Sequence, residues 1–192
     1  MASNYLNSEQ IAINDEIFVK FIDYDEIIKR IKTLAEQISS DYQNDVPVFI
    51  GILNGSFIFM ADLLKEITID CEVDFFKLSS YGDSKISSGN VKMLKDLNCD
   101  ITNRRVVIVE DIVDTGLSIK YMLELLANKK PKDVKIASLL LKPKSLKYDV
   151  KIDYVAFEIP SKFVLGYGLD YAQKYRNLKS IYILKEENND GV

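Results

Sequence analysis

The sequence predicts an α/β protein built on a mostly parallel, twisted sheet with helices on its faces. Two apolar runs, residues 46–53 and 106–109, have the composition and length of strands that are buried on both faces, as strands of parallel sheets are. Segments with helical apolar spacing, such as residues 23–40, lie between runs of this kind. Both runs end in short polar turns, and open α/β sheets bind ligands at the carboxyl ends of their strands.

Composition limits the class of protein. A chain of 192 residues with 47% apolar and 28% charged residues suits a globular protein, and we expect residues 1–192 to form a single domain. No apolar run approaches the ~20 residues of a membrane span, and the first residues do not resemble a signal peptide. The net charge of −4 argues against nucleic acid as a partner. We therefore expect a cytoplasmic protein that binds neither membranes nor nucleic acid.

The available side chains also restrict the chemistry. The chain has no histidine, which excludes Ser–His and Cys–His triads and leaves carboxylates as the expected acids and bases. Cys71 and Cys99 lack the spacing of metal sites or disulfide scaffolds, so we expect two free thiols.

Four elements are expected before residue 65. Residues 11–21 could form a strand or an arm, whereas residues 23–40 carry one apolar helical face with acids in the first turn. The strand at 46–53 is followed by a turn at 54–56 and a nearly all-apolar helix at 57–64. This helix start could accept an anion, although a tight structural turn explains the same residues equally well.

The next segment predicts two strands around a polar loop. Residues 71–80 are typical of a strand, and residues 91–94 could be the strand that returns beside it. Residues 81–90 (YGDSKISSGN) between them are too polar to bury themselves. Loops of this length without secondary structure are commonly lids or linkers, so we expect a mobile loop here.

The most informative stretch is residues 105–118 (RVVIVEDIVDTGLS). Its apolar strand ends in Glu110 and Asp111, and an apolar helical stripe begins after the turn from Asp114 to Ser118. The free N–H groups and dipole at a helix start favour a phosphate monoester. The acids would repel that phosphate, so we expect them to bind vicinal sugar hydroxyls or Mg²⁺.

Three more strands are expected toward the carboxyl terminus. They are residues 134–141, 153–159 and 180–184, and the last is expected to close the sheet. Lys142 follows the first of these strands, and residues 160–171 form a connection rich in aromatic residues and glycine.

The motif VIVEDIVDTGLS resembles the phosphoribosyl pyrophosphate motif of the type I phosphoribosyltransferases, in the form of their purine salvage branch. The resemblance covers residues 47–184. It implies the type I phosphoribosyltransferase fold, with a hood subdomain formed from the amino-terminal segment and about 153–184, and a flexible loop at Ser80 and Tyr81 that closes over the site. It also implies Mg²⁺-dependent transfer of a 5-phosphoribosyl group from phosphoribosyl pyrophosphate to N9 of hypoxanthine or guanine, which gives IMP or GMP and pyrophosphate.

The resemblance implies a role for each matching residue. Asp114 is expected to be the catalytic base that accepts the purine N7 proton. The other expected contacts are Glu110 and Asp111 for the ribose; Asp114, Thr115, Gly116, Leu117 and Ser118 for the 5-phosphate; Leu53, Asn54, Gly55 and Arg176 for the pyrophosphate; Lys142, Phe163, Val164 and Asp170 for the purine; and Glu110, Asp111 and Asp170 for Mg²⁺.

The chain departs from the common family pattern at Asn54, where many relatives carry lysine. That change removes a cation near the pyrophosphate and leaves the main-chain donors of Gly55 and Ser56. The Leu53–Asn54 bond falls where many relatives hold a cis peptide. The resemblance also implies a homodimer or homotetramer.

The residues alone leave other interpretations open. The central motif could be a buried strand with a capped helix, Lys142 a solvated turn residue and Phe163 a core side chain. A regulator of RNA or DNA on the same fold would need a basic face, for which this acidic chain shows no evident arginine cluster. An unrelated nucleotide-binding α/β protein is disfavoured because neither GxGxxG nor GxxxxGK[ST] is present.

Overall fold

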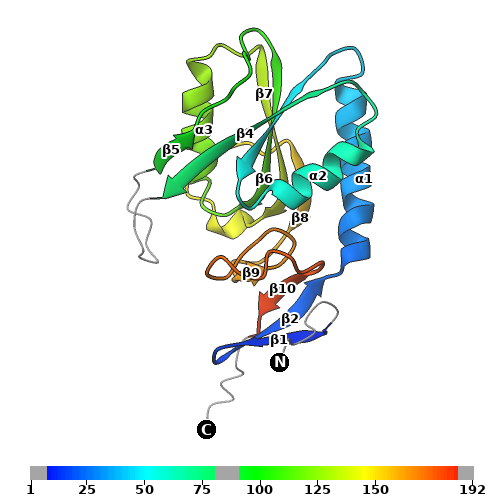
Figure 1. The fold of residues 1–192 in the computed structure, drawn as a ribbon, viewed down its shortest axis with the longest axis vertical. Coiled ribbons are helices and arrows are strands. Elements are labelled where there is room, and N and C mark those ends of the chain that lie inside the picture. The colour runs from blue at the N-terminus through cyan, green and yellow to red at the C-terminus, as the bar shows by residue number, and fades with distance from the viewer. Residues whose placement is uncertain (1–7, 81–90, 186–192) are drawn as a thin grey trace.

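The computed structural model describes residues 8–80 and 91–185, which form two β-sheets with α-helices against them (Figure 1). The strands are β1 (Gln10–Ile13), β2 (Glu16–Ile22), β3 (Val48–Leu53), β4 (Glu72–Ser80), β5 (Val91–Lys95), β6 (Arg105–Val113), β7 (Asp133–Leu141), β8 (Tyr154–Glu158), β9 (Val164–Leu165) and β10 (Ile181–Leu184). The helices are α1 (Tyr24–Asp41), α2 (Phe57–Glu66), α3 (Leu117–Ala127) and the short 3₁₀ helix η2 (Pro143–Ser145).

The larger sheet confirms the predicted α/β fold. Its strand order is β5-β4-β3-β6-β7-β8. All neighbours pair in parallel except β5, which returns antiparallel to β4 as expected. Because parallel strands end at the same edge, the residues that follow β3, β6 and β7 meet at one side of the sheet.

Two apolar clusters join this sheet to its helices. On one face, Ile31 of α1 and Phe59 of α2 belong to the same buried cluster as Val107 of β6. On the other face, Met122 of α3 clusters with Ile108. Each fully buried side chain of this size stabilises the fold by roughly 1.5–3 kcal/mol. The clusters hold β6 from both faces and fix the position of its carboxyl end.

Helix α1 begins where the sequence indicates. The side chain of Asp23 accepts a hydrogen bond from the Asp25 N–H at 3.2 Å and caps the helix. Its apolar face is buried at Ile27, Ile31, Leu34 and Ile38. Farther along, the Arg30 Nε donates to the Ala156 carbonyl at 2.8 Å, which ties α1 to β8.

The smaller sheet has the order β1-β2-β10-β9 and corrects two expectations. Residues 11–21 contain two strands, because Asn14 adopts a left-handed φ of 53° and turns the chain into a hairpin. Residues 180–184 do not close the large sheet, since β10 lies between β2 and β9. After β8 the chain leaves the large sheet at Pro160, a residue that cannot donate a ladder hydrogen bond.

The smaller sheet lies beyond the edge of the larger sheet at which β4 ends (Figure 1). Ile22, Val164 and Ile181 of the smaller sheet belong to the same apolar cluster as α1 and α2. The division of residues 1–192 into one domain with a hood stays a prediction. In the described ranges, none of the helices has the length and apolar character needed to cross a membrane.

Candidate active site

The turn after β6 forms a small hollow at the start of α3. Gly116 caps the helix with a left-handed φ of 82°, and a Cβ there would lie 2.9 Å from Val150 Cγ2. Thr115 Oγ1 accepts a hydrogen bond from the Leu117 N–H at 3.3 Å. A cavity of about 90 Å³ is lined by Glu110 and residues 112–119. The first N–H groups of a helix lack partners within the helix, so this hollow suits an anion.

Strand β6 continues to Val113, which places Glu110 and Asp111 inside the strand. Glu110 is only 7% exposed and pairs with Ser138 of β7 in the sheet register. Asp111 Oδ1 accepts a hydrogen bond from the Ile112 N–H at 2.9 Å. Both acids therefore lie near the carboxyl end of β6, where the hydrogen bonds of the sheet fix their backbone positions.

Burial perturbs both acids. Burial raises the pKa of Glu110 well above its usual range, and the neighbouring Asp111 charge adds to the rise. Burial also raises the pKa of Asp111 to about 6, although its hydrogen bond from Ile112 and the charge of Arg176 act in the opposite direction. Glu110 Oε2 is buried and has no hydrogen-bond partner among the residues that the structure describes. Strongly perturbed acids at a sheet edge are typical of functional sites.

The turn after β3 packs directly against Asp111. The Leu53–Asn54 peptide is cis, where the resemblance places such a bond. A Cβ atom at Gly55 would overlap the Asp111 carboxylate, so any other residue here would push that side chain out of place. A Cβ at Gly168 would in turn clash with the Gly55 carbonyl oxygen. Asp111, Gly55 and Gly168 therefore lie in contact although they come from three separate segments.

Residues 166–176 bring Asp170 and Arg176 to the same place. An Arg176 Nη2–Asp170 Oδ1 ion pair measures 2.7 Å, and the Arg176 Nη1 donates to the Gly168 carbonyl at 2.7 Å. Asp170 Oδ2 also accepts from the Gln173 N–H at 2.8 Å. Arg176 is thus held beside the Gly55 turn by its own loop.

Lys142 and Asp114 form a second pair at this edge. Lys142 Nζ lies 2.9 Å from Asp114 Oδ2, and Lys142 is 8% exposed. The interpretation of Lys142 as a solvated turn residue is therefore wrong. The Asp114 side chain keeps 49% of its surface exposed, so it can still meet a ligand.

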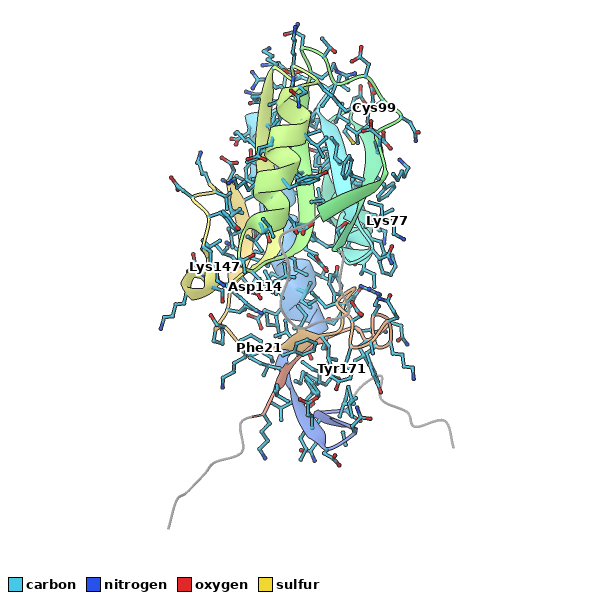
Figure 2. The ribbon with its side chains drawn as sticks, turned by 90° about the vertical axis from the view of Figure 1, so that its left-hand side faces the viewer. Phe21, Lys77, Cys99, Asp114, Lys147 and Tyr171 are labelled. Atoms are coloured by element: carbon cyan, nitrogen blue, oxygen red, sulfur yellow. The ribbon has the colours of Figure 1, made fainter. Side chains whose placement is uncertain are left out.

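Phe163 lies on the smaller sheet's side of the site. It is 45% exposed, which rules out the alternative that it is a core side chain. Its ring packs edge-on against Phe18 at 6.1 Å and Tyr171 at 5.7 Å between centroids. Figure 2 shows Asp114 near the start of α3, with Tyr171 below it on the smaller sheet's side. Val164, next to Phe163, is buried in β9 and pairs with Ile183.

The structure brings most of the predicted residues together at the carboxyl ends of the parallel strands. Gly55, Asp111, Asp170 and Arg176 form one group, and the turn after β6 forms another with Glu110 and Lys142. Ser80 ends β4, and Tyr81 lies outside the described residues. Sequence reasoning missed Gly168, whose signal was the Gly-Tyr-Gly triplet at 166–168.

This fold and site define a phosphoribosyl transferase. Residues 22–172 match the family described as phosphoribosyl transferase domain, and the chain belongs to that family. The chain is 49% identical to the hypoxanthine-guanine phosphoribosyltransferase of Bacillus subtilis (strain 168) over 164 residues, which are 85% of this chain and 91% of that protein.

Solved structures agree with this assignment. A hypoxanthine phosphoribosyltransferase from Staphylococcus aureus matches with a TM-score of 0.83 and 42% identity, over 86% of this chain and 90% of that one. The Trypanosoma cruzi hypoxanthine phosphoribosyltransferase in complex with the product IMP matches with a TM-score of 0.80 and 38% identity, over 86% of this chain and 93% of that one. The predicted type I phosphoribosyltransferase fold is confirmed.

Proposed function

We propose that this chain is a purine salvage enzyme that transfers a 5-phosphoribosyl group from phosphoribosyl pyrophosphate to N9 of hypoxanthine or guanine. The observation that carries the proposal is the juxtaposition of the buried acid Glu110 with a helix-start cavity at residues 112–119. Acids bind sugar hydroxyls, and a helix start binds phosphate, so together they suit a ribose 5-phosphate. The names of the relatives support the purine specificity.

Each group of residues then has a separate task. Thr115 to Ser118 bind the 5-phosphate through main-chain N–H groups and hydroxyls, while Glu110 and Asp111 orient the ribose. As the bond from the anomeric carbon to pyrophosphate breaks, negative charge grows on the leaving group. Arg176 and the Gly55 N–H stabilise that charge. The Ser56 N–H, which was also expected to contribute, instead donates to the Ile52 carbonyl at 3.3 Å. Asn54 contributes no cation, so Arg176 carries more of this task here.

The purine is held from two sides. Phe163 offers an exposed ring for stacking, and the backbone of the adjacent Val164, together with Asp170, would meet the base edge. Lys142 donates to the exocyclic oxygen of a 6-oxopurine, and Asp114 accepts the N7 proton as N9 attacks. The 2.9 Å contact between Lys142 and Asp114 supports these two roles because it places both groups within reach of one purine.

This set of residues suits a magnesium ion that is coordinated by both the protein and the substrate. In the described part of the chain, no three acidic, cysteine or histidine side chains gather closely enough to hold a metal by themselves. Mg²⁺ characteristically uses one or two carboxylates together with substrate oxygens. One or two of Glu110, Asp111 and Asp170 would supply such contacts, and the bound ion would neutralise charge on the pyrophosphate.

The test is a direct transfer assay. The protein is incubated with phosphoribosyl pyrophosphate, Mg²⁺ and hypoxanthine, guanine, xanthine or adenine, and nucleotide is separated by chromatography. The proposal expects IMP and GMP, with AMP absent, and a mixture without Mg²⁺ serves as the control. Failure to form any nucleotide would refute the function, and AMP as the main product would refute the purine assignment.

Two further features of the proposal rest on the family resemblance. We infer that the protein is cytoplasmic and that it forms a homodimer or homotetramer. Sedimentation of the purified chain tests the oligomeric state, and a monomer at working concentration would contradict it.

A further inference from the structure

A buried hydrogen bond joins α2 to the loop that carries Asp170. Tyr167 is 1% exposed, and its hydroxyl donates to Asp62 Oδ2 at 2.6 Å. Asp62 lies in α2, the helix that follows the Gly55 turn. The two residues are 105 positions apart in sequence, so the contact ties two distant parts of the site together. Neither residue is used in the proposed reaction.

The backbone at Tyr167 needs such an anchor. Tyr167 has a left-handed φ of 50°, and Gly166 and Gly168 on either side have φ values of 96° and 98°. A bulky residue in this region is held only by its surroundings. The Tyr167 N–H donates to the Leu178 carbonyl at 2.8 Å, and its ring lies 6.4 Å from the Tyr24 ring. The bond to Asp62 fixes the far end of the same side chain.

Fixing Tyr167 also fixes Gly168, the residue that touches the pyrophosphate turn. Gly168 packs on the Gly55 carbonyl so closely that a Cβ would clash. The Gly168 N–H donates to the Arg176 carbonyl at 2.9 Å, and Arg176 Nη1 donates back to the Gly168 carbonyl at 2.7 Å. A shift at Tyr167 would therefore move Gly168 and Arg176 relative to Gly55.

We propose that Asp62 and Tyr167 are positioning residues, which hold the Arg176 loop against the Gly55 turn so that both reach the pyrophosphate group together. The inference rests on the proposed function, since it assigns these residues to the pyrophosphate side of that site. They touch neither substrate. Their effect is larger for phosphoribosyl pyrophosphate and pyrophosphate than for the purine, because Lys142, Phe163 and Val164, which are expected to bind the purine, lie outside residues 166–176.

The test replaces Tyr167 with phenylalanine, which removes one hydroxyl and keeps the ring. The lost hydrogen bond is one to a charged carboxylate, which is among the stronger kinds, so we expect the KM for phosphoribosyl pyrophosphate to rise about tenfold in Tyr167→Phe. The KM for hypoxanthine should stay within about twofold of wild type. Calorimetric binding of pyrophosphate with Mg²⁺ should weaken by a similar factor.

Tyr154 provides a matched control. It is 2% exposed and donates to Asp41 Oδ2 at the same 2.6 Å, but it lies at the start of β8, at the opposite end of the sheet from the site. The Tyr154 hydroxyl also accepts a hydrogen bond from Lys135 Nζ at 2.9 Å, so Tyr154→Phe should lower the melting temperature at least as much as Tyr167→Phe while leaving both KM values unchanged. A merely structural role for Tyr167 predicts that the two variants behave alike.

Asp62 variants test the same bond from the acceptor side. Asp62→Asn keeps an oxygen that can accept from Tyr167 and should stay within about twofold of wild type, whereas Asp62→Leu should reproduce the KM change. If Tyr167→Phe does not fold, the comparison of the two Asp62 variants tests the inference instead. Unchanged pyrophosphate binding in Tyr167→Phe, or equal behaviour of the two Asp62 variants, overturns the inference. Absence of transfer by the wild-type protein would instead refute the proposed function.

Discussion

Replacement of Asp111 by asparagine should stabilise the ligand-free protein at neutral pH. Burial raises the pKa of Asp111 from its ordinary 3.8 to about 6, so the folded state holds the proton more tightly than the unfolded chain does. The stability of the wild-type protein therefore falls as the pH rises from about 4 to 6, and the full penalty is present above pH 6. Asparagine cannot ionise, and its oxygen can still accept the hydrogen bond that Ile112 donates to Asp111 at 2.9 Å.

The size of the effect follows from the two pKa values. The difference between 3.8 and about 6 corresponds to about 3 kcal/mol at pH 8. At pH 5 the gain from Asp111→Asn should fall to roughly half of that value, because the wild-type carboxyl is already partly protonated. For a chain of this length the gain at pH 8 corresponds to a rise in melting temperature of roughly 6–12 °C.

Urea unfolding of both proteins at pH 5 and pH 8, without substrate or metal, measures these differences. Asp74 serves as the control, since it is 5% exposed but has the opposite shift. Burial alone would raise the pKa of Asp74, yet the N–H groups of Cys99 and Phe75 and the Lys95 ammonium lower it below its usual value. Asp74→Asn should therefore destabilise the protein at pH 8. The reasoning is refuted if Asp111→Asn is no more stable than wild type at pH 8.

Three further predictions concern the reaction. Asp114→Asn should lower kcat by about 10²–10⁴ and keep the KM for both substrates near wild type, as steady-state kinetics would show; unchanged turnover would remove Asp114 from the mechanism. Phe163→Ala should raise the KM for hypoxanthine about tenfold, because base stacking on an aromatic ring is worth about 1–3 kcal/mol. Its thermal unfolding should stay close to that of wild type, and an equal rise in KM for both substrates would argue against stacking. Chelation of divalent cations with EDTA should abolish transfer and added Mg²⁺ should restore it, whereas full activity in EDTA would exclude the metal.

The parts of the fold that the sequence predicted are those that local patterns determine. Helix α1 has a cap at Asp23 and a continuous apolar face, and the parallel strands are runs of branched apolar residues. The predicted end of β6 was too early. A charged residue ordinarily marks the end of a buried strand, but here Glu110 is buried within it.

The remaining features depend on contacts between distant segments. The hairpin at Asn14 and the place of β10 in the smaller sheet follow from strand pairing, which the spacing of apolar residues does not specify. The contact of Gly55 with Asp111 and the bond from Tyr167 to Asp62 join segments more than 50 residues apart. Strand-end motifs and the family resemblance identified the predicted site residues, and only the folded chain shows which of them touch.

A crystal structure determined after soaking the crystals with IMP would test the proposed phosphate site directly. We expect the nucleotide phosphate in the cavity lined by residues 112–119, with the ribose hydroxyls on Glu110 and Asp111. A nucleotide bound elsewhere, with no contact to the turn from Thr115 to Ser118, would contradict the assignment of this turn as the sugar-phosphate site.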